Sequence, residues 1–496
     1  MPPAMKALAD RAAEVLRPDR LTIWGLTAAF LAMAAVGGLV VSTGNVILIA
    51  LALGGMIGVA LLGMPAITLT LILVGALVLS GPLAFYVQAL DKLPWLFAIL
   101  GFLLAGSALI HAGLHRRDTP TPLFVTLAVC FVVYAAASTA WADVPLAEAV
   151  KGLKRQLQYW GVLFAFAVVA FPARTVRAWV LLLLGITLVQ APMSVYQRFV
   201  LVPSMDGEPI DAVVGTLELS QIGTGASGVL ALMQVCAIAA LACAWRERLL
   251  RAPALAAGLV LVFVPLLVGE VNVIFLWIPL ALLVVFADQL LANPLRFVAG
   301  FVAGAAALVA FGSAYLVWQQ TGSHTAEPVD ERIETILEYN IGETGYSNKT
   351  GLNRKTVYQH WWKQHGFQDP RATVFGHGVG SAFSAEDGRS AVSLRQGGLD
   401  LDLVSASSVL WDFGLVGLAL YLGVFAAAAA HAWRLARTAR PGLERALARS
   451  ALAATVLAAS SLVYSNAMVM MPSQQVLVFS MLGFIAWLAR ARPRAR

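Results

Sequence analysis

Charged residues are scarce in this sequence. They make up 12% of the 496 residues, against roughly 25% in a typical soluble domain, whereas hydrophobic residues make up 59%. The apolar surplus falls in blocks of about 20 residues, the length that crosses a hydrocarbon core of about 30 Å as a helix. This composition excludes a soluble enzyme and a nucleic-acid-binding protein.

Cysteine is nearly absent as well. Cys130, Cys236 and Cys243 are the three in the chain, and each lies inside an apolar block. This excludes a disulfide framework and favours a packing role for these side chains. The formal net charge of +7 is less informative about function than the placement of the charges, because in membrane proteins Lys and Arg concentrate in cytoplasmic loops.

Hydropathy predicts an all-α polytopic integral membrane protein with about 14 transmembrane helices and one large, partly helical periplasmic loop. The predicted spans are 22–41, 44–63, 65–86, 93–114, 121–141, 157–171, 176–196, 222–245, 254–269, 271–288, 295–318, 405–433, 447–465 and 473–489. The predicted regions are a cytoplasmic lead-in (1–21), spans 1–11 (22–318), the loop (319–404), spans 12–14 (405–489) and a cytoplasmic basic tail (490–496).

The placement of Lys and Arg predicts the orientation. With the N-terminus in the cytoplasm, the arginines around 246–251, 434–449 and 490–496 all fall on the cytoplasmic side. Both termini are then cytoplasmic and the long loop is periplasmic. The basic cluster Lys151, Lys154 and Arg155 departs from this pattern, since it falls outside, just before a span. It is explained either by a local topology error or by an interfacial anchor.

A second departure is the apolar stretch 254–287, which is too long for one crossing. Gly269-Glu270 near its centre predicts two short helices joined by a hinge. Glu270 is an ionisable residue within an apolar run, which is costly and usually functional, although a carboxylate reaching interfacial water explains it too.

The long loop holds two helix-compatible stretches, Asp330–Tyr339 and Asn353–His365. In the second, Arg354, Tyr358, Trp361 and His365 share one helical face. An arginine fork, two aromatic rings and an imidazole could bind a sugar diphosphate. The alternative is an amphipathic helix lying on the membrane surface.

A glycine-rich run follows, in which Gly376, Gly378 and Gly380 alternate with other residues. Glycines permit positive φ and close backbone approach, so exposed amides could cradle an anion. A turn that returns the chain to the membrane explains the run equally well, and no βαβ unit supports a dinucleotide fingerprint. His360, His365 and His377 do not have a recognisable metal-ligand spacing, so no metal site is expected.

Three local motifs together resemble the O-antigen ligase and polysaccharide polymerase superfamily. Gly351–Arg354, then Trp361 and the run Phe375–Gly380, are similar to the family's arginine, tryptophan and "lG.G.G" loop pattern. Trp411–Leu418 resembles its "E.GliGl" start of the next span, and Val214–Leu217 is similar to its "R..GtF" element.

The resemblance implies a membrane glycosyltransferase in a bacterial inner membrane. Its donor would be a polyprenyl-diphosphate-linked oligosaccharide and its acceptor a glycan or a lipid. Transfer would proceed with inversion, without metal or other cofactor. Membrane lipids and other envelope-polysaccharide assembly proteins are the expected partners, and no nucleic acid is.

Site residues follow from the resemblance. A leaving diphosphate needs cations and the acceptor hydroxyl benefits from a base. The expected cations are Arg354 first, then Lys151, Lys154, Arg155 and Arg198; the candidate bases are Asp400, Asp402, Glu270 and His377.

The sequence also departs from the family pattern. The arginine before "GtF" is missing, which leaves Asp211 as the nearest ionisable candidate for substrate binding. The histidine expected before "E.GliGl" is missing too, and Gly269-Glu270 stands in place of a Ser-Arg pair. These departures favour a polymerase over a ligase. A transporter or flippase of a polar or lipid-linked substrate is the alternative, and an inactive scaffold is a third possibility.

Overall fold

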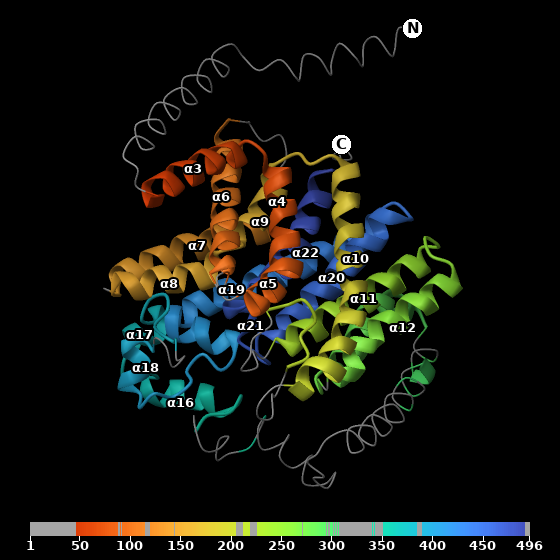
Figure 1. Ribbon diagram of the computed structural model, residues 1–496. Helices are drawn as coiled ribbons and strands as arrows, with labels where there is room; N and C mark the ends of the chain where they lie inside the picture. Colours follow the sequence, from red (N-terminus) through yellow and green to blue (C-terminus); the bar gives the residue numbers. More distant parts are fainter. Residues whose placement is uncertain are drawn as a thin grey trace. The chain divides into compact units, whose positions relative to one another are not determined.

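The computed structural model describes residues 46–87, 92–114, 120–142, 144–204, 212–218, 226–269, 271–293, 351–383 and 389–491, with isolated positions between them. Every regular element in these ranges is a helix, which confirms the all-α class (Figure 1). The chain divides into two units, Met1–Met64 and Pro65–Arg496. The first contributes one described helix, the uncharged α3 (Val46–Leu62).

Seven helices of the second unit are long and apolar enough to cross a membrane. They are Pro65–Tyr86 (α4 Pro65–Val74, the π-helix η1 Gly75–Leu79 and α5 Ser80–Tyr86), α6 (Leu93–Leu114), α7 (Leu123–Trp141), Ala173–Ser204 (α10 Ala173–Tyr196, η3 Gln197–Leu201 and η4 Val202–Ser204), α11 (Ser227–Arg246), α19 (Ser405–Thr438) and α22 (Pro472–Arg490). Two apolar helices are shorter, α12 (Ala252–Val268) and most of α13 (Ile274–Ala292). Several apolar helices of this length are what a multi-pass membrane protein requires.

The predicted spans coincide with helices wherever the structure describes them, with one exception. The predicted span 93–114 is α6, and 447–465 corresponds to α20 (Leu443–Ser461). The exception is 157–171, where α9 (Trp160–Val168) has nine residues, about 14 Å, which is half of a hydrocarbon core. Spans 22–41 and most of 295–318 lie outside the described residues, so the total of fourteen stays a prediction.

The long apolar stretch 254–287 divides as predicted. Helix α12 ends at Val268 and α13 begins at Ile274, with a turn between them. Glu270 lies outside the described residues. The division follows from length, because a single helix through this stretch would be about 50 Å long, well beyond one hydrocarbon core.

Helices α11 and α22 are the most enclosed of the apolar helices, since α11 packs on α12, α13 and α20, and α22 packs on α9 and α20. An ion network ties α11, α13 and α20 together. The Arg246 guanidinium donates two hydrogen bonds to Asp288, at 2.7 and 2.6 Å. Arg449 bridges Asp288 and Glu247, at 2.8 and 2.5 Å. Two guanidiniums and two carboxylates therefore neutralise one another at this end of the bundle.

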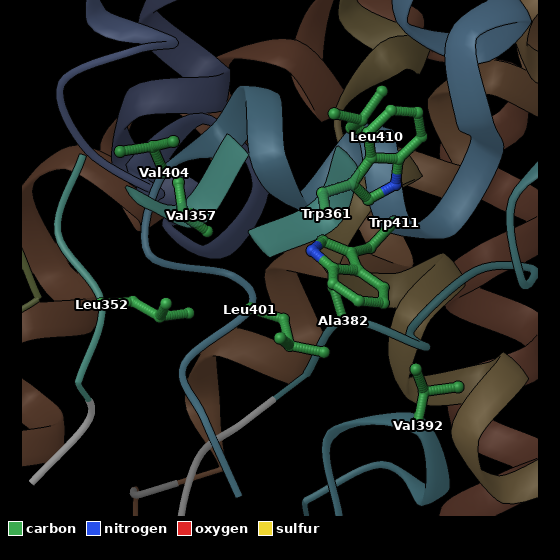
Figure 2. Packing of buried hydrophobic residues seen from close by; sticks show 9 residues of the cluster. All are labelled: Leu352, Val357, Trp361, Ala382, Val392, Leu401, Val404, Leu410 and Trp411. Atoms are coloured by element: carbon green, nitrogen blue, oxygen red, sulfur yellow. The ribbon is translucent and has the colours of Figure 1, made fainter. Parts of the chain in front are cut away.

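The loop between α13 and α19 is described over 351–383 and 389–404, and we call these residues the loop segment. It holds three short helices: α16 (Thr356–Gln364), α17 (Pro370–Phe375) and α18 (Ala391–Arg395). Helix α16 confirms the stretch expected at 353–365, whereas Asp330–Tyr339 lies outside the described residues. The segment has its own hydrophobic core, in which Trp361 of α16 and Trp411 of α19 lie close together beside Ala382 (Figure 2).

Helix α19 breaks at Gly414, whose φ of 63° and ψ of −164° lie outside the helical region. Its carbonyl groups next to the break accept hydrogen bonds from elsewhere. The Trp411 carbonyl accepts from the His377 N–H at 3.0 Å, and the Asp412 carbonyl from the Gly378 N–H at 2.7 Å. The Phe413 carbonyl accepts from the Tyr134 hydroxyl of α7 at 2.9 Å. The break thus supplies hydrogen-bond acceptors for the loop segment and for α7.

Candidate functional site

The glycine-rich run folds around the carboxylate of Asp412. Residues 376–382 form a turn, here named the glycine turn, and its amides point at this side chain. Oδ2 of Asp412 accepts from the Gly380 N–H at 2.8 Å, and Oδ1 accepts from the Ala382 N–H and the Ser381 hydroxyl, both at 2.8 Å. The side-chain amide of Gln156 also donates to Oδ2. Asp412 is 1% exposed, so these four donors satisfy a buried carboxylate.

Glycine is required in this turn by conformation and by space. Gly376, Gly378 and Gly380 have φ of 73°, 87° and 84°. A Cβ on Gly376 would lie 2.4 Å from the Asp412 carbonyl oxygen, and a Cβ on Gly380 would lie 2.9 Å from the Glu148 carbonyl oxygen. The turn is therefore pressed against both α19 and α8 (Leu146–Leu157).

Amides that cradle an anion are present as the sequence suggested, but the anion belongs to the chain itself. The Gly378 and Gly380 amides donate to Asp412, and the Gly376 amide donates to the Ala372 carbonyl. An external anion would have to displace these bonds. These hydrogen bonds join the loop segment to α19.

Three histidines, His360, His365 and His377, surround the Trp411 ring, and we call them the histidine cluster. The Nε2 atoms of His365 and His377 are 2.8 Å apart, and Nδ1 of His365 is 3.0 Å from the Trp361 carbonyl oxygen. A carbonyl only accepts, so Nδ1 of His365 carries a proton and its Nε2 accepts one from His377 when both rings are neutral. His377 then keeps a lone pair on Nδ1.

Burial lowers the pKa of His365 and of His360, and burial together with neighbouring His365 and Arg395 lowers the pKa of His377 to about 4. A histidine whose folded pKa is below its unfolded value contributes stability that is present above about pH 6.5 and is lost as pH falls toward the folded value.

The midpoint of thermal unfolding should therefore fall between pH 7 and pH 5. His377→Gln should weaken this dependence, whereas His111→Gln, outside the cluster, should retain it. If the His377→Gln variant showed the same pH dependence of the thermal midpoint as wild type, the lowered pKa of His377 would not be its source.

A cavity of about 790 Å³ opens where the end of α7 and the start of α8 meet α17 and α18. Its wall includes the rings of Trp141 and Phe375, which stack at 5.7 Å between centroids and an angle of 26°. Trp141 is 66% exposed and Phe375 is 39% exposed. A cavity of this size that joins aromatic surface to a few polar groups is typical of a small-molecule or glycan site.

The cavity also carries charge of both signs. The Arg371 guanidinium lies 5.2 Å from the Trp141 ring centroid, and Arg395 is a second basic residue in the wall. Glu148 and Asp369 are the carboxylates in the wall, and Oδ1 of Asp369 accepts from the Ala372 N–H at the start of α17. Of the residues expected at the site, Gly376 and His377 line this cavity.

The basic cluster lies on the amphipathic helix α8, next to the glycine turn. Lys151 is exposed, Lys154 lies over the Trp95 ring at 4.9 Å, and the Arg155 guanidinium lies over the Phe383 ring at 3.2 Å. Lys154 is also near Glu218. Burial and the charge of Arg155 lower the pKa of Lys154, while the Glu218 carboxylate opposes that shift.

Glu218 is a polar residue that the sequence did not single out. Its carboxylate accepts from the Ser473 N–H and hydroxyl, at 2.8 and 2.9 Å, at the start of α22. Burial raises the pKa of Glu218 to about 7, and the Ser473 hydrogen bonds and Lys154 act against it. Glu218 directly follows the "GtF"-like element Val214–Leu217, whose Thr216 is held by Gln190, so this segment contacts both α10 and α22.

The face predicted from Arg354, Tyr358, Trp361 and His365 is mostly turned inward. Trp361 is 3% exposed, and His365 is buried against Trp411. Nε of Arg354 donates to the Tyr464 carbonyl at 2.6 Å, and its guanidinium stacks on the Tyr464 ring at 4.2 Å and bonds to Asn340. This face belongs to the core of the loop segment, so it is not the open ligand face that the sequence suggested.

The remaining candidates lie away from the cavity or outside the described residues. Asp402 is buried just ahead of α19, and Asp400 is half-buried beside it. Arg198 lies in the π-helical turn that ends α10. Asp211 and Glu270 lie outside the described residues, so their roles stay predictions.

Sequence reasoning missed Asp412, Trp141, Arg371 and Arg395. Asp412 was visible as the acidic residue of Trp411–Leu418, where a carboxylate stands beside two glycines in an apolar run. The other three come together through folding alone, because Trp141 lies more than 200 residues before Arg371. No protein-family model and no curated protein matches this chain.

Proposed function

We propose that this chain is a membrane glycosyltransferase that acts on a polyprenyl-diphosphate-linked glycan, with polymerisation favoured over ligation. The observation that carries the proposal is the cavity between the α7–α8 corner and the loop segment. It lies at the end of α7, beside an amphipathic basic helix. If α7 spans the bilayer, this end would lie at the level of lipid headgroups, where the headgroup of a lipid-linked donor would be. A transporter would need its site near the middle of the spans.

The basic cluster on α8 and the aromatic wall of the cavity could bind two different parts of such a donor, its diphosphate and its sugar rings. Lys151, Lys154 and Arg155 on α8 would bind the diphosphate, as the resemblance implies. The aromatic wall of Trp141 and Phe375 would take sugar rings. Both lie on or next to one short helix, so a lipid-linked saccharide could contact both at once.

The proposed reaction breaks the anomeric C–O bond to the diphosphate and forms a bond from that carbon to an acceptor oxygen. The polyprenyl diphosphate leaves with the electron pair, and the acceptor hydroxyl loses its proton to a base. Cations stabilise the charge that develops on the leaving group. Among the base candidates, His377 lines the cavity and has an Nδ1 lone pair in its neutral tautomer.

The localisation follows from the proposal and from the orientation of the basic loops. The chain would sit in a bacterial inner membrane with both termini in the cytoplasm, and the loop segment would face the periplasm. The donor, once flipped, and the growing glycan would then meet on the side where the cavity opens. Polymerisation is favoured because the histidine expected of a ligase before the "E.GliGl"-like motif is replaced by Asp400-Leu401-Asp402.

The test is release of free polyprenyl diphosphate by the purified protein. The double variant Lys151→Gln/Lys154→Gln removes two of the three cations proposed to bind the diphosphate. It is expected to reduce release by about 100-fold, since each lost charged hydrogen-bonding group weakens binding or transition-state stabilisation by about tenfold. Arg437→Gln, an exposed arginine in the last turn of α19, is the matched control and should keep wild-type release. Wild-type release in the double variant would remove the basic cluster on α8 from the mechanism.

A further inference from the structure

The two arginines that line the cavity, Arg371 and Arg395, are not part of the diphosphate site proposed on α8. In the part of the chain that the structure describes, neither Arg371 nor Arg395 forms an ion pair with a carboxylate, and both side chains are exposed in the cavity. Arg371 lies against Trp141, and this cation–π contact favours a position of the guanidinium beside the ring. A guanidinium in this position can donate two parallel hydrogen bonds to a planar anion with two oxygens, such as a carboxylate.

The carboxylates in the same wall are compensated locally. Asp369 caps α17 through the Ala372 N–H at 2.9 Å. Glu148 lies in the first turn of α8, where the helix dipole favours negative charge. Each acid is therefore stabilised by its own helix start, and the positive charge of the arginines remains available for a ligand.

The third element of the cavity is its exposed aromatic surface. Trp141 and Phe375 present stacked rings next to Arg371. An aromatic face beside a guanidinium suits a ligand that joins an apolar ring face to an anionic group. The diphosphate of the donor is already assigned to the cations of α8, whereas a sugar acid brings a ring and a carboxylate together within one residue.

We infer that this cavity binds an acidic saccharide, with a sugar ring on Trp141 and its carboxylate on Arg371 and Arg395. The inference rests on the proposed function and names the substrate class of the same site: the glycan that is transferred or extended carries uronic-acid-type residues. The carboxylate is uncharged only at acid pH, so recognition by the arginines persists throughout the neutral range.

Calorimetric titration of the intact protein in nanodiscs of zwitterionic lipid tests this. The probes are oligosaccharides that contain glucuronic, galacturonic or mannuronic acid, each paired with its carboxyl-reduced neutral counterpart. At least one acidic probe should bind, and its reduced counterpart should bind about tenfold more weakly or worse. Arg371→Gln and Arg395→Gln should each remove this preference, Trp141→Leu should weaken both members of the pair, and Arg437→Gln should change neither.

Three outcomes would overturn the inference: equal binding of an acidic probe and its neutral counterpart, no binding of any acidic probe, or displacement of the acidic probe by inorganic diphosphate at equal concentration. The last would assign the arginines to the diphosphate of the donor. The proposed function fails separately, by absence of polyprenyl diphosphate release. Release from a neutral lipid-linked donor without any acidic preference would keep the function and remove the substrate class.

Discussion

Asp412→Ala is expected to be among the most destabilising single substitutions in the chain. The change leaves the Gly380 and Ala382 amides, the Ser381 hydroxyl and the Gln156 side-chain amide without their acceptor in a buried place. Each stranded donor costs about 1–3 kcal/mol, so the free energy of unfolding should fall by more than about 3 kcal/mol. The glycine turn should detach from α19, and the proposed glycan-transfer activity should be lost with it.

The measurement is the midpoint of thermal unfolding in detergent, read with the proportion of protein that elutes as a single species. Asp412→Asn keeps one carbonyl acceptor but places an NH₂ group against an N–H donor, so it should fall between wild type and alanine. Asp369→Asn is the control, because asparagine also caps a helix and Asp369 is exposed. An Asp412→Ala protein as stable as wild type would show that the turn is held by other contacts.

Gly414→Ala is expected to have a comparable effect by a different route. The combination of φ 63° and ψ −164° is essentially restricted to glycine, and a Cβ there would lie 2.5 Å from the backbone carbonyl of Val374. Backbone strain costs about 1–3 kcal/mol, and the backbone of Val374 cannot turn aside as a flexible side chain would. We expect poor recovery of folded protein and separation of α17 from α19.

Gly423→Ala is the matched control for this substitution. It lies in the same helix, in helical conformation, and a Cβ there would meet Leu127 at an ordinary contact distance of 3.5 Å. Its thermal midpoint should equal that of wild type or rise slightly. Equal midpoints for the two alanine variants would mean that the break at Gly414 is not needed for folding.

The helices were largely predictable from hydropathy because a membrane-spanning helix requires an apolar stretch of about 20 residues, which is easily recognised in a sequence. The boundaries of α6, α7, α10 and α19 lie within a few residues of the predicted spans, apart from the extension of α19 to Thr438. The prediction failed where length and apolarity were borderline. Residues 157–171 looked like a span, but the polar helix α8 continues to Leu157, and α9 alone is half the required length.

The site was harder to predict than the fold, for two physical reasons. The first is that a helical face gives periodicity but not direction: Trp361 and His365 do share a face, yet that face is buried against Trp411. The second is that a run of glycines predicts a close approach to the backbone but does not predict which group makes that approach. Here Asp412 of the same chain fills the place that the pattern suggested for a ligand.

The cavity is invisible to sequence reasoning because its walls are distant in the chain. Trp141 ends one span, Arg371 starts a short loop helix, and Arg395 ends another, and each alone has an ordinary explanation. An aromatic residue at a span end is common at membrane interfaces, and single loop arginines are usually solvated. Only their convergence on one 790 Å³ cavity makes them a candidate site.

The central claim is that a glycan leaves a polyprenyl diphosphate on this protein and joins an acceptor hydroxyl. The most direct measurement follows both products in one reaction of the purified wild-type protein with a polyprenyl-diphosphate oligosaccharide: free polyprenyl diphosphate, and glycan length on a sizing gel. We predict release together with a ladder of lengthened glycans. Release with a single added unit would identify a ligase instead, and no release in the presence of authentic donor and acceptor would contradict the claim.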